Sequence, residues 1–139
     1  FAQTFMIMTY EQILSDIRKR EFHPIYFLMG EEPFFIDTIS DELENNILDE
    51  AERSFNQVLL YGSDVTAKDI MSQARAFPMM GERLVVIVKE AQNVKDIESL
   101  SEYLDKLPPT TILIICYKYK KTSRMGSLFA YQIKGEIIP

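Results

Sequence analysis

Three short, almost entirely apolar runs constrain the fold of this chain more than any other feature of its sequence. They cover residues 25–29, 84–88 and 111–117. Uninterrupted apolar runs are typical of strands that are covered on both faces, as the central strands of parallel sheets are. Segments with apolar residues at helical spacing lie between the runs. This alternation predicts an α/β fold in which helices flank a parallel five-stranded sheet.

The expected elements follow from apolar spacing and from residues that start or stop a helix. Thr9 and Gln12 have the pattern of a capping box, and Pro33 suits the first turn of a helix. We expect strands over residues 25–29, 55–61, 84–88, 111–117 and 136–138. We expect helices over residues 9–21, from 33 onward, and over 66–76, 94–107 and 127–134.

The helix that Pro33 opens has two different faces. Its inner face is an apolar stripe formed by Ile36, Ile39, Leu43 and Ile47. Its outer face is acidic and consists of Asp37, Asp41, Glu42, Glu44, Asp49 and Glu50. We expect this outer face to be a solvated surface, with a binding surface for a basic partner as the alternative.

A segment with the outline of a phosphate-binding loop follows the first apolar run. The turn between strand and helix consists of Gly30, Glu31, Glu32 and Pro33. A working loop of this kind needs several glycines, a lysine for the phosphate charge and a Ser or Thr for Mg²⁺. This turn has one glycine and neither of the others, its glutamates would repel phosphate, and Phe34 and Phe35 would fill the space of a nucleotide. We therefore expect no nucleotide cofactor; an ordinary strand–turn–helix is the alternative reading.

A nucleotide hydrolase would also need a carboxylate site, at the end of the strand that pairs with the phosphate loop. The run 84–88 ends in Lys89 and Glu90, which is a weak match to such a site. The single His23 has no recognisable nucleophile beside it, and the single Cys116 lies in an apolar run, where a buried, inert thiol is expected. We expect no catalytic residue and no metal ligand, and we keep an ATPase with an atypical site as an alternative.

Residues 77–81 form a second unusual segment. Phe77 and Pro78 precede Met79 and Met80, and Gly81 follows. The two methionines could turn inward and fill the core. They could instead form an exposed, adaptable hydrophobic wedge, because methionine is flexible and polarisable and suits a binding surface.

The charge of the chain bears on its partners. The formal net charge is −6, which disfavours tight binding of nucleic acid by this chain alone. A weak single-strand-binding module remains an alternative, through a basic loop with interleaved aromatics: Tyr117, Lys118, Tyr119, Lys120, Lys121 and Arg124. No apolar run approaches the length of a membrane span, so we expect no membrane partner and a cytoplasmic location.

Three segments together resemble the delta-subunit family of the bacterial DNA polymerase III clamp loader. The first is residues 24–37, with an apolar strand before Gly-Glu-Glu-Pro-Phe. The second is residues 77–89, with a proline, two bulky apolar residues, Gly-Glu-Arg and a valine-rich strand. The third is residues 111–124, with an apolar strand before a lysine-rich segment. The resemblance extends from about residue 8 over nearly the whole chain.

The resemblance implies a degenerate AAA+ (P-loop-type) nucleotide-binding fold that does not itself use ATP. In the family, the bulky pair after the proline inserts into a hydrophobic pocket of the sliding clamp, the beta subunit. Carried over, that pair is Met79 and Met80, with Phe77 and Pro78 beside them; the family often has Leu or Phe at the pair. The implied function is to bind the clamp and help to open the ring during DNA replication, without catalysis.

The resemblance also implies a domain organisation. We expect residues 1–7 to be a tag or disordered tail and residues 8–139 to be a single AAA+-like N-terminal domain. The small lid and collar domains of the family would be absent from this chain. Contacts with the other clamp-loader subunits would then be made through those missing domains, and contact with DNA would be indirect.

Overall fold

A parallel β-sheet organises the structure. The computed structural model describes residues 6–30, 32–118 and 133–136. Six strands form one sheet in the order β1-β6-β2-β5-β4-β3, and every hydrogen-bonded pair is parallel. The strands are β1 (Met6–Thr9), β2 (Ile25–Gly30), β3 (Gln57–Tyr61), β4 (Leu84–Lys89), β5 (Thr111–Lys118) and β6 (Ile133–Glu136).

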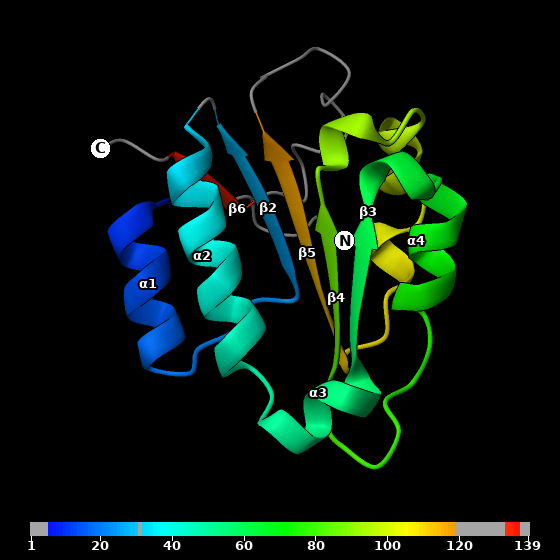
Figure 1. Ribbon diagram of the computed structural model, residues 1–139, viewed down its shortest axis with the longest axis horizontal. Coiled ribbons are helices and arrows are strands. Elements are labelled where there is room, and N and C mark those ends of the chain that lie inside the picture. Colours follow the sequence, from blue (N-terminus) through cyan, green and yellow to red (C-terminus); the bar gives the residue numbers. More distant parts are fainter. Residues whose placement is uncertain (1–5, 31, 119–132, 137–139) are drawn as a thin grey trace.

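Helices cover both faces of this sheet (Figure 1). One face carries α1 (Tyr10–Arg18) and α2 (Pro33–Asn46). The other carries α4 (Ala67–Ala74) and four 3₁₀ turns named η1 (Gly62–Asp64), η2 (Ala91–Asn93), η3 (Ile97–Glu102) and η4 (Leu104–Lys106). A short helix, α3 (Glu50–Asn56), lies at the lower end of the sheet in Figure 1.

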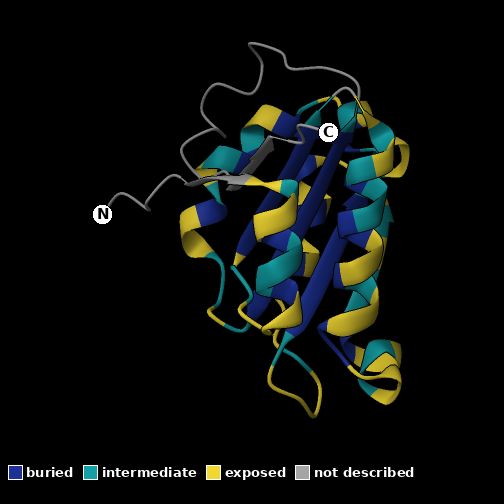
Figure 2. Cartoon of the chain, turned by 90° about the vertical axis from the view of Figure 1, so that its left-hand side faces the viewer, coloured by how far each residue is buried: buried dark blue, intermediate teal, exposed yellow. Residues whose placement is uncertain are grey.

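Side chains of the central strands alternate between two cores. In β4, Val86 and Val88 face the α4 side, whereas Val85 and Ile87 face α1 and α2. Strands β2 and β5 alternate in the same way, and all three are buried along almost their whole length (Figure 2). Each fully buried aliphatic side chain stabilises the fold by about 1.5–3 kcal/mol relative to an exposed one. The uninterrupted apolar runs are therefore explained, as inferred from the sequence, by strands that are covered on both faces.

The α/β class, the parallel sheet and the flanking helices are confirmed, but the expected number of five strands is wrong. The additional strand is β1, whose Met6 and Ile7 fall in the segment expected to be a tail. Strand β6 begins at Ile133, where the end of a helix over 127–134 was expected; residues 127–132 lie outside the described part of the chain.

Two further elements differ from expectation for local reasons. Residues 55–56 belong to α3 and not to a strand, because the Asp49 side chain accepts from the Glu52 N–H at 2.8 Å and starts a helix. The helix expected over 94–107 is two 3₁₀ turns, η3 and η4. The Asp96 carboxylate, which precedes η3, accepts from the Ala67 N–H at 3.0 Å and so caps α4 instead of its own turn.

The strand order determines the neighbours of the phosphate-loop strand β2. Strand β4, which was considered for the carboxylate site of a hydrolase, does not pair with β2; β5 lies between them and pairs with both. Parallel strands require crossover connections, and this order brings the ends of β2, β5 and β4 together.

No helix in the described part of the chain has the length and apolarity needed to cross a bilayer.

A buried hydrogen bond ties the C-terminal end of α4 to the start of β5. The Thr111 hydroxyl donates to the Ala74 carbonyl at 2.7 Å, and Thr111 is fully buried. Thr111→Val should lower the free energy of unfolding by about 1–3 kcal/mol, because the Ala74 carbonyl would lose its partner. Urea denaturation measures the change.

The adjacent threonine is the matched control for this prediction. The Thr110 hydroxyl is buried without a hydrogen-bond partner among the described residues. Thr110→Val should therefore be neutral or slightly stabilising. Equal losses in the two variants would contradict a specific role for the Thr111 bond.

Candidate functional site

The parallel sheet gathers its connecting segments at two opposite edges (Figure 1). At the carboxyl edge lie Gly30, Lys89 and Lys118, which end β2, β4 and β5. At the amino edge, α3 lies near the loop of residues 75–83 that joins α4 to β4. We call this segment the Met79 loop. The two candidate sites of the sequence analysis are thus at opposite ends of the molecule.

The turn after β2 does not have the geometry of a glycine-rich loop. Gly30 has no positive φ, and a Cβ at this position would meet nothing within 4 Å. Glu32 is the N-cap of α2, and its carboxylate accepts from the Phe34 N–H at 3.4 Å. Pro33, the first residue of the helix, has no N–H to offer. The end of α2 where a phosphate would bind is thus capped by the protein's own carboxylate; Glu31 lies outside the described residues.

A lysine is held between two carboxylates beside this turn. The Lys118 Nζ lies 2.8 Å from Asp37 Oδ1 on α2 and 2.9 Å from Glu90 Oε2 after β4. Burial by itself lowers the pKa of Lys118, but the hydrogen bonds to Asp37 and Glu90 outweigh it and raise the pKa above its ordinary value. Lys118 is therefore cationic at neutral pH and already engaged by the protein's own anions.

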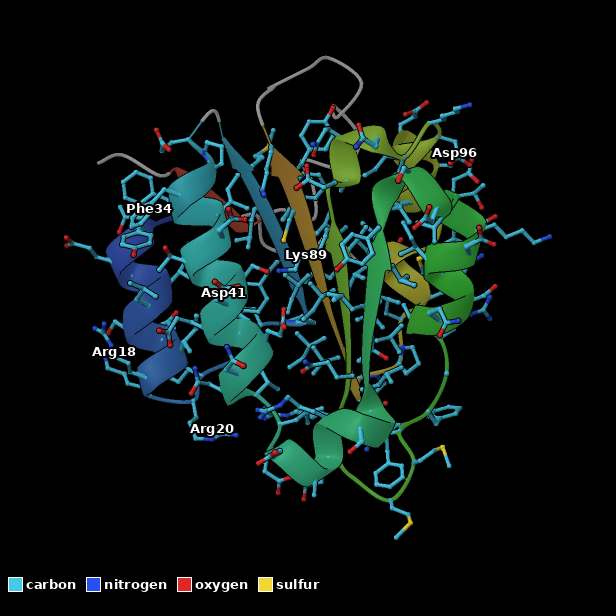
Figure 3. All side chains as sticks on the ribbon, in the orientation of Figure 1. Arg18, Arg20, Phe34, Asp41, Lys89 and Asp96 are labelled. Atoms are coloured by element: carbon cyan, nitrogen blue, oxygen red, sulfur yellow. The ribbon has the colours of Figure 1, made fainter. Side chains whose placement is uncertain are left out.

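The second lysine of this edge is paired in the same way. Lys89 Nζ lies 3.4 Å from Glu44 Oε1 and 3.9 Å from Asp41 Oδ1, both on α2. Figure 3 shows the labelled Lys89 in front of the sheet, on the side of the helix that carries Asp41. Part of the acidic face expected to be merely solvated is thus an internal counterion for lysines at the strand ends.

Glu90, the weak candidate for a metal carboxylate, is fixed in an uncommon backbone conformation. Its φ is 52°, in the left-handed region. A Cβ on Gly62 would lie 2.0 Å from the Glu90 carbonyl oxygen, so only glycine allows this approach. The Glu90 side chain contacts Lys118 and Gln92. Among the described residues, no group of three or more His, Cys, Asp or Glu side chains is arranged to hold a metal ion.

Two members of the set considered for single-strand binding are already engaged within the protein. Tyr117 is buried within the core, and Lys118 belongs to β5 and is paired. The other members of the set lie outside the described residues: Tyr119, Lys120, Lys121 and Arg124.

The prediction of a buried thiol is confirmed, because Cys116 is inside the core and burial raises its pKa to about 11.

The Met79 loop exposes large apolar side chains. The exposed fraction is 74% for Phe77, 63% for Met79 and 97% for Met80, and Pro78 is half-buried. The two methionines therefore do not fill the core. Met80 has a φ of 54°, a left-handed conformation that costs a residue other than glycine about 1–2 kcal/mol.

A buried asparagine that sequence reasoning missed holds this loop. Asn56, the last residue of α3, donates from Nδ2 to the Met79 carbonyl at 2.8 Å and accepts the Met79 N–H on Oδ1 at 2.6 Å. The sequence contained one relevant signal, because Asp49 and Glu52 have the spacing of a helix start. The contact itself joins residues 23 positions apart, and no local pattern indicates it.

A charged hollow of about 390 Å³ lies beside the apolar tip of the loop. It is lined by Arg20, Ile47, Leu48, Glu52, Gly81, Glu82 and Arg83. Arg20, labelled in Figure 3, donates to the Asn46 and Ile47 carbonyls at the end of α2. Arg20 and Arg83 both lie over the Phe22 ring, each with Cζ 5.1 Å from its centre. Exposed apolar side chains with charged groups beside them are typical of protein–protein contact surfaces.

The ion pairs of Lys118 at the carboxyl edge should contribute measurably to the stability of the fold. Lys118→Met would leave Asp37 and Glu90 facing each other, and we expect the free energy of unfolding to fall by about 1–2 kcal/mol at pH 7, since both carboxylates are partly exposed. Because the folded-state pKa of Lys118 is raised, this stabilisation is present below the ordinary lysine pKa of 10.5 and is lost only as pH rises through the folded value. Urea denaturation at pH 7 and pH 9 should give the same difference between variant and wild type.

Lys68→Met is the control for this measurement. Lys68 is exposed on α4. Its replacement should change stability by less than about 0.5 kcal/mol. A similar small effect from Lys118→Met would show that the ion pairs contribute little.

Comparisons with known proteins agree with this architecture. A structure described as the Bacillus subtilis DNA clamp loader delta protein has a TM-score of 0.77 and 20% sequence identity, and the match covers 91% of this chain and 42% of that one. At that identity the likeness shows the fold. The DNA polymerase III subunit delta of Bacillus subtilis (strain 168) is 25% identical over 126 residues, which cover 84% of this chain and 36% of the relative.

The family profile "DNA polymerase III, delta subunit" matches residues 26–134, which is most of the chain. The chain spans less than half the length of either relative. The matched region includes the capped turn after β2, the Lys118 ion pairs and the Met79 loop. The chain therefore belongs to the delta-subunit family of DNA polymerase III.

Proposed function

We propose that this chain is the clamp-binding part of a clamp-loader subunit in DNA replication. The Met79 loop inserts Met79 and Met80 into an apolar pocket of the sliding clamp, and Phe77 and Pro78 contact the pocket rim. The observation that carries the proposal is the exposure of both methionines on a loop whose backbone is hydrogen-bonded to α3. Two such side chains contribute roughly 3–6 kcal/mol in area terms, before the cost of ordering.

Ring opening requires no chemistry from this chain. A protein that binds the open clamp more tightly than the closed clamp shifts the ring equilibrium toward the open state. In this proposal, Met79 and Met80 supply part of that difference in affinity. The remaining clamp-loader subunits would be contacted through parts of the protein outside this chain, and DNA indirectly.

The fold is, in this proposal, a degenerate AAA+ module that works without ATP. Three features support this view: Glu32 caps α2, Pro33 lacks an N–H, and Lys118 is engaged by Asp37 and Glu90. A triphosphate would have to displace these internal carboxylates to reach the lysines. The alternative of an atypical ATPase gains no supporting contact from the described residues.

The clamp proposal predicts a loss of affinity when both methionines are shortened. For Met79→Ala/Met80→Ala we expect binding to the sliding clamp of the same organism to weaken several-fold to about a thousandfold, which corresponds to roughly 1–4 kcal/mol. Surface plasmon resonance with the closed ring, and with a clamp variant that cannot close, measures both affinities. The loss should be larger for the variant that cannot close.

Phe34→Ala is a matched control for this experiment. Phe34 is 63% exposed, as Met79 is, but it lies at the N-terminal end of α2, at the carboxyl edge (Figure 3). Its replacement should leave clamp binding unchanged. A folded double-methionine variant with wild-type affinity would exclude the Met79 loop as the contact.

A nucleotide titration tests the degenerate site. With millimolar ATP and Mg²⁺ we expect no change in the melting temperature, since a ligand that binds the native state must stabilise it. AMP at the same concentration, without Mg²⁺, controls for non-specific effects. A melting temperature that rises with ATP·Mg²⁺ concentration would instead favour the ATPase alternative.

A further inference from the structure

The Asn56 side chain is buried where it contacts an exposed loop. Asn56 is 1% exposed, whereas Met79, whose backbone it binds, is 63% exposed. One planar amide serves both polar groups of the Met79 backbone, the N–H at 2.6 Å and the carbonyl at 2.8 Å. This is the pattern that a neighbouring strand would provide, delivered by a single side chain.

The position of Asn56 and the glycine at position 81 of the loop both permit this contact. Asn56 ends α3 and is followed directly by β3, which pairs with β4 from Gln57↔Val85 onward. On the loop side, a Cβ on Gly81 would lie 2.8 Å from Asn56 Nδ2 and 3.1 Å from Glu52 Oε2. Glycine at position 81 leaves the space that the Asn56 amide occupies.

The loop needs such a support because its tip is otherwise unfavourable. Met80 is 97% exposed and has a φ of 54°. Neither its side chain nor its backbone conformation favours the observed structure on its own. The two bonds to Met79 fix the residue immediately before it.

We propose that Asn56 is a positioning residue that holds the Met79 loop in the conformation presented to the clamp. This inference rests on the proposed function and adds the group that orders the site before binding. A loop held in its binding conformation loses less conformational freedom on association. If only a fraction of molecules has the competent loop, the apparent Kd rises by the inverse of that fraction.

Asparagine is chemically suited to this role. The contact needs one acceptor for the Met79 N–H and one donor for the Met79 carbonyl on the same flat group. Alanine supplies neither. Aspartate keeps the acceptor but turns a second acceptor toward the carbonyl, so Asn56→Asp removes one bond while preserving the volume.

The test uses amide hydrogen exchange of the chain alone, followed by NMR. We expect Met79 N–H exchange to accelerate at least about tenfold in Asn56→Ala, which lacks both groups, and to accelerate also in Asn56→Asp, in which a buried carboxylate oxygen would face the Met79 carbonyl oxygen. Gly81→Ala would place a methyl group against the Asn56 amide and so disturb the same contact from the loop side; it should also accelerate exchange of the Met79 N–H. Core amides of β4 should change only as far as global stability changes.

Asn45→Ala is the matched control. Asn45 is exposed on α2, and its side chain donates to the Asp41 carbonyl of its own helix. This variant should leave Met79 exchange unchanged. If Asn56→Ala does not fold, Asn56→Asp and Gly81→Ala decide the question.

Clamp affinity is the second readout. We expect Asn56→Ala to weaken binding by about three- to thirtyfold, in line with the loss of competent loop. In the Met79→Ala/Met80→Ala background, Asn56→Ala should have almost no further effect, because it acts through the methionines. A full additional loss in that background would overturn the inference.

Two other results would also overturn the inference. One is unchanged Met79 exchange in folded variants of Asn56 and Gly81. The other is unchanged clamp affinity in a variant whose loop exchanges faster. If wild-type protein does not bind the clamp at all, the proposed function fails, and exchange alone decides whether Asn56 orders the loop.

Discussion

Burial of both faces of β2, β5 and β4 is the constraint on which the rest of the structure depends. A strand covered on both sides is apolar at almost every position, and parallel neighbours must be joined by crossovers that supply the covering helices. The connecting segments then fall at two edges of one sheet. The ion pairs of Lys118 and Lys89 and the contact of Asn56 with Met79 lie at these edges, whereas the described side chains of the central strands between them are buried and almost all apolar.

The two edges have opposite character. At the carboxyl edge, charges are matched within the chain: Lys118 with Asp37 and Glu90, and Lys89 with Glu44 and Asp41. At the amino edge, apolar side chains remain exposed while the backbone beneath them is hydrogen-bonded to Asn56. Charged groups that already pair with one another within the chain are less available to a ligand. Exposed methionine side chains on a hydrogen-bonded loop, by contrast, have apolar surface that a partner could bury.

Features that depend on near neighbours could be predicted from the sequence. The apolar runs predicted the central strands, and the capping box of Thr9 and Gln12 formed as expected. Pro33 also occupies the first position of α2. Features that depend on distant residues could not be predicted, because nothing local encodes them. They include the insertion of β5 between β2 and β4, the pairing of Lys118 with Glu90, and the contact of Asn56 with Met79.

Competition between local and tertiary contacts explains the misplaced elements. Asp96 could have started its own helix, but its carboxylate caps α4, and the segment that follows it forms 3₁₀ turns. The sequence also could not decide whether the two methionines are buried or exposed, because apolar residues between a proline and a glycine can point into the core or into solvent. Only the position of the Met79 loop outside both cores decides it.

The backbone of Met80 has a consequence for how this protein can change. A left-handed residue is most easily accommodated as glycine, so a chain optimised for folding alone would gain from losing the side chain there. Methionine at that position lowers the stability of the fold but supplies an apolar side chain to the proposed contact, so the two requirements conflict at a single residue. Substitutions that stabilise the unbound protein at this position would remove the most exposed side chain of the proposed contact surface.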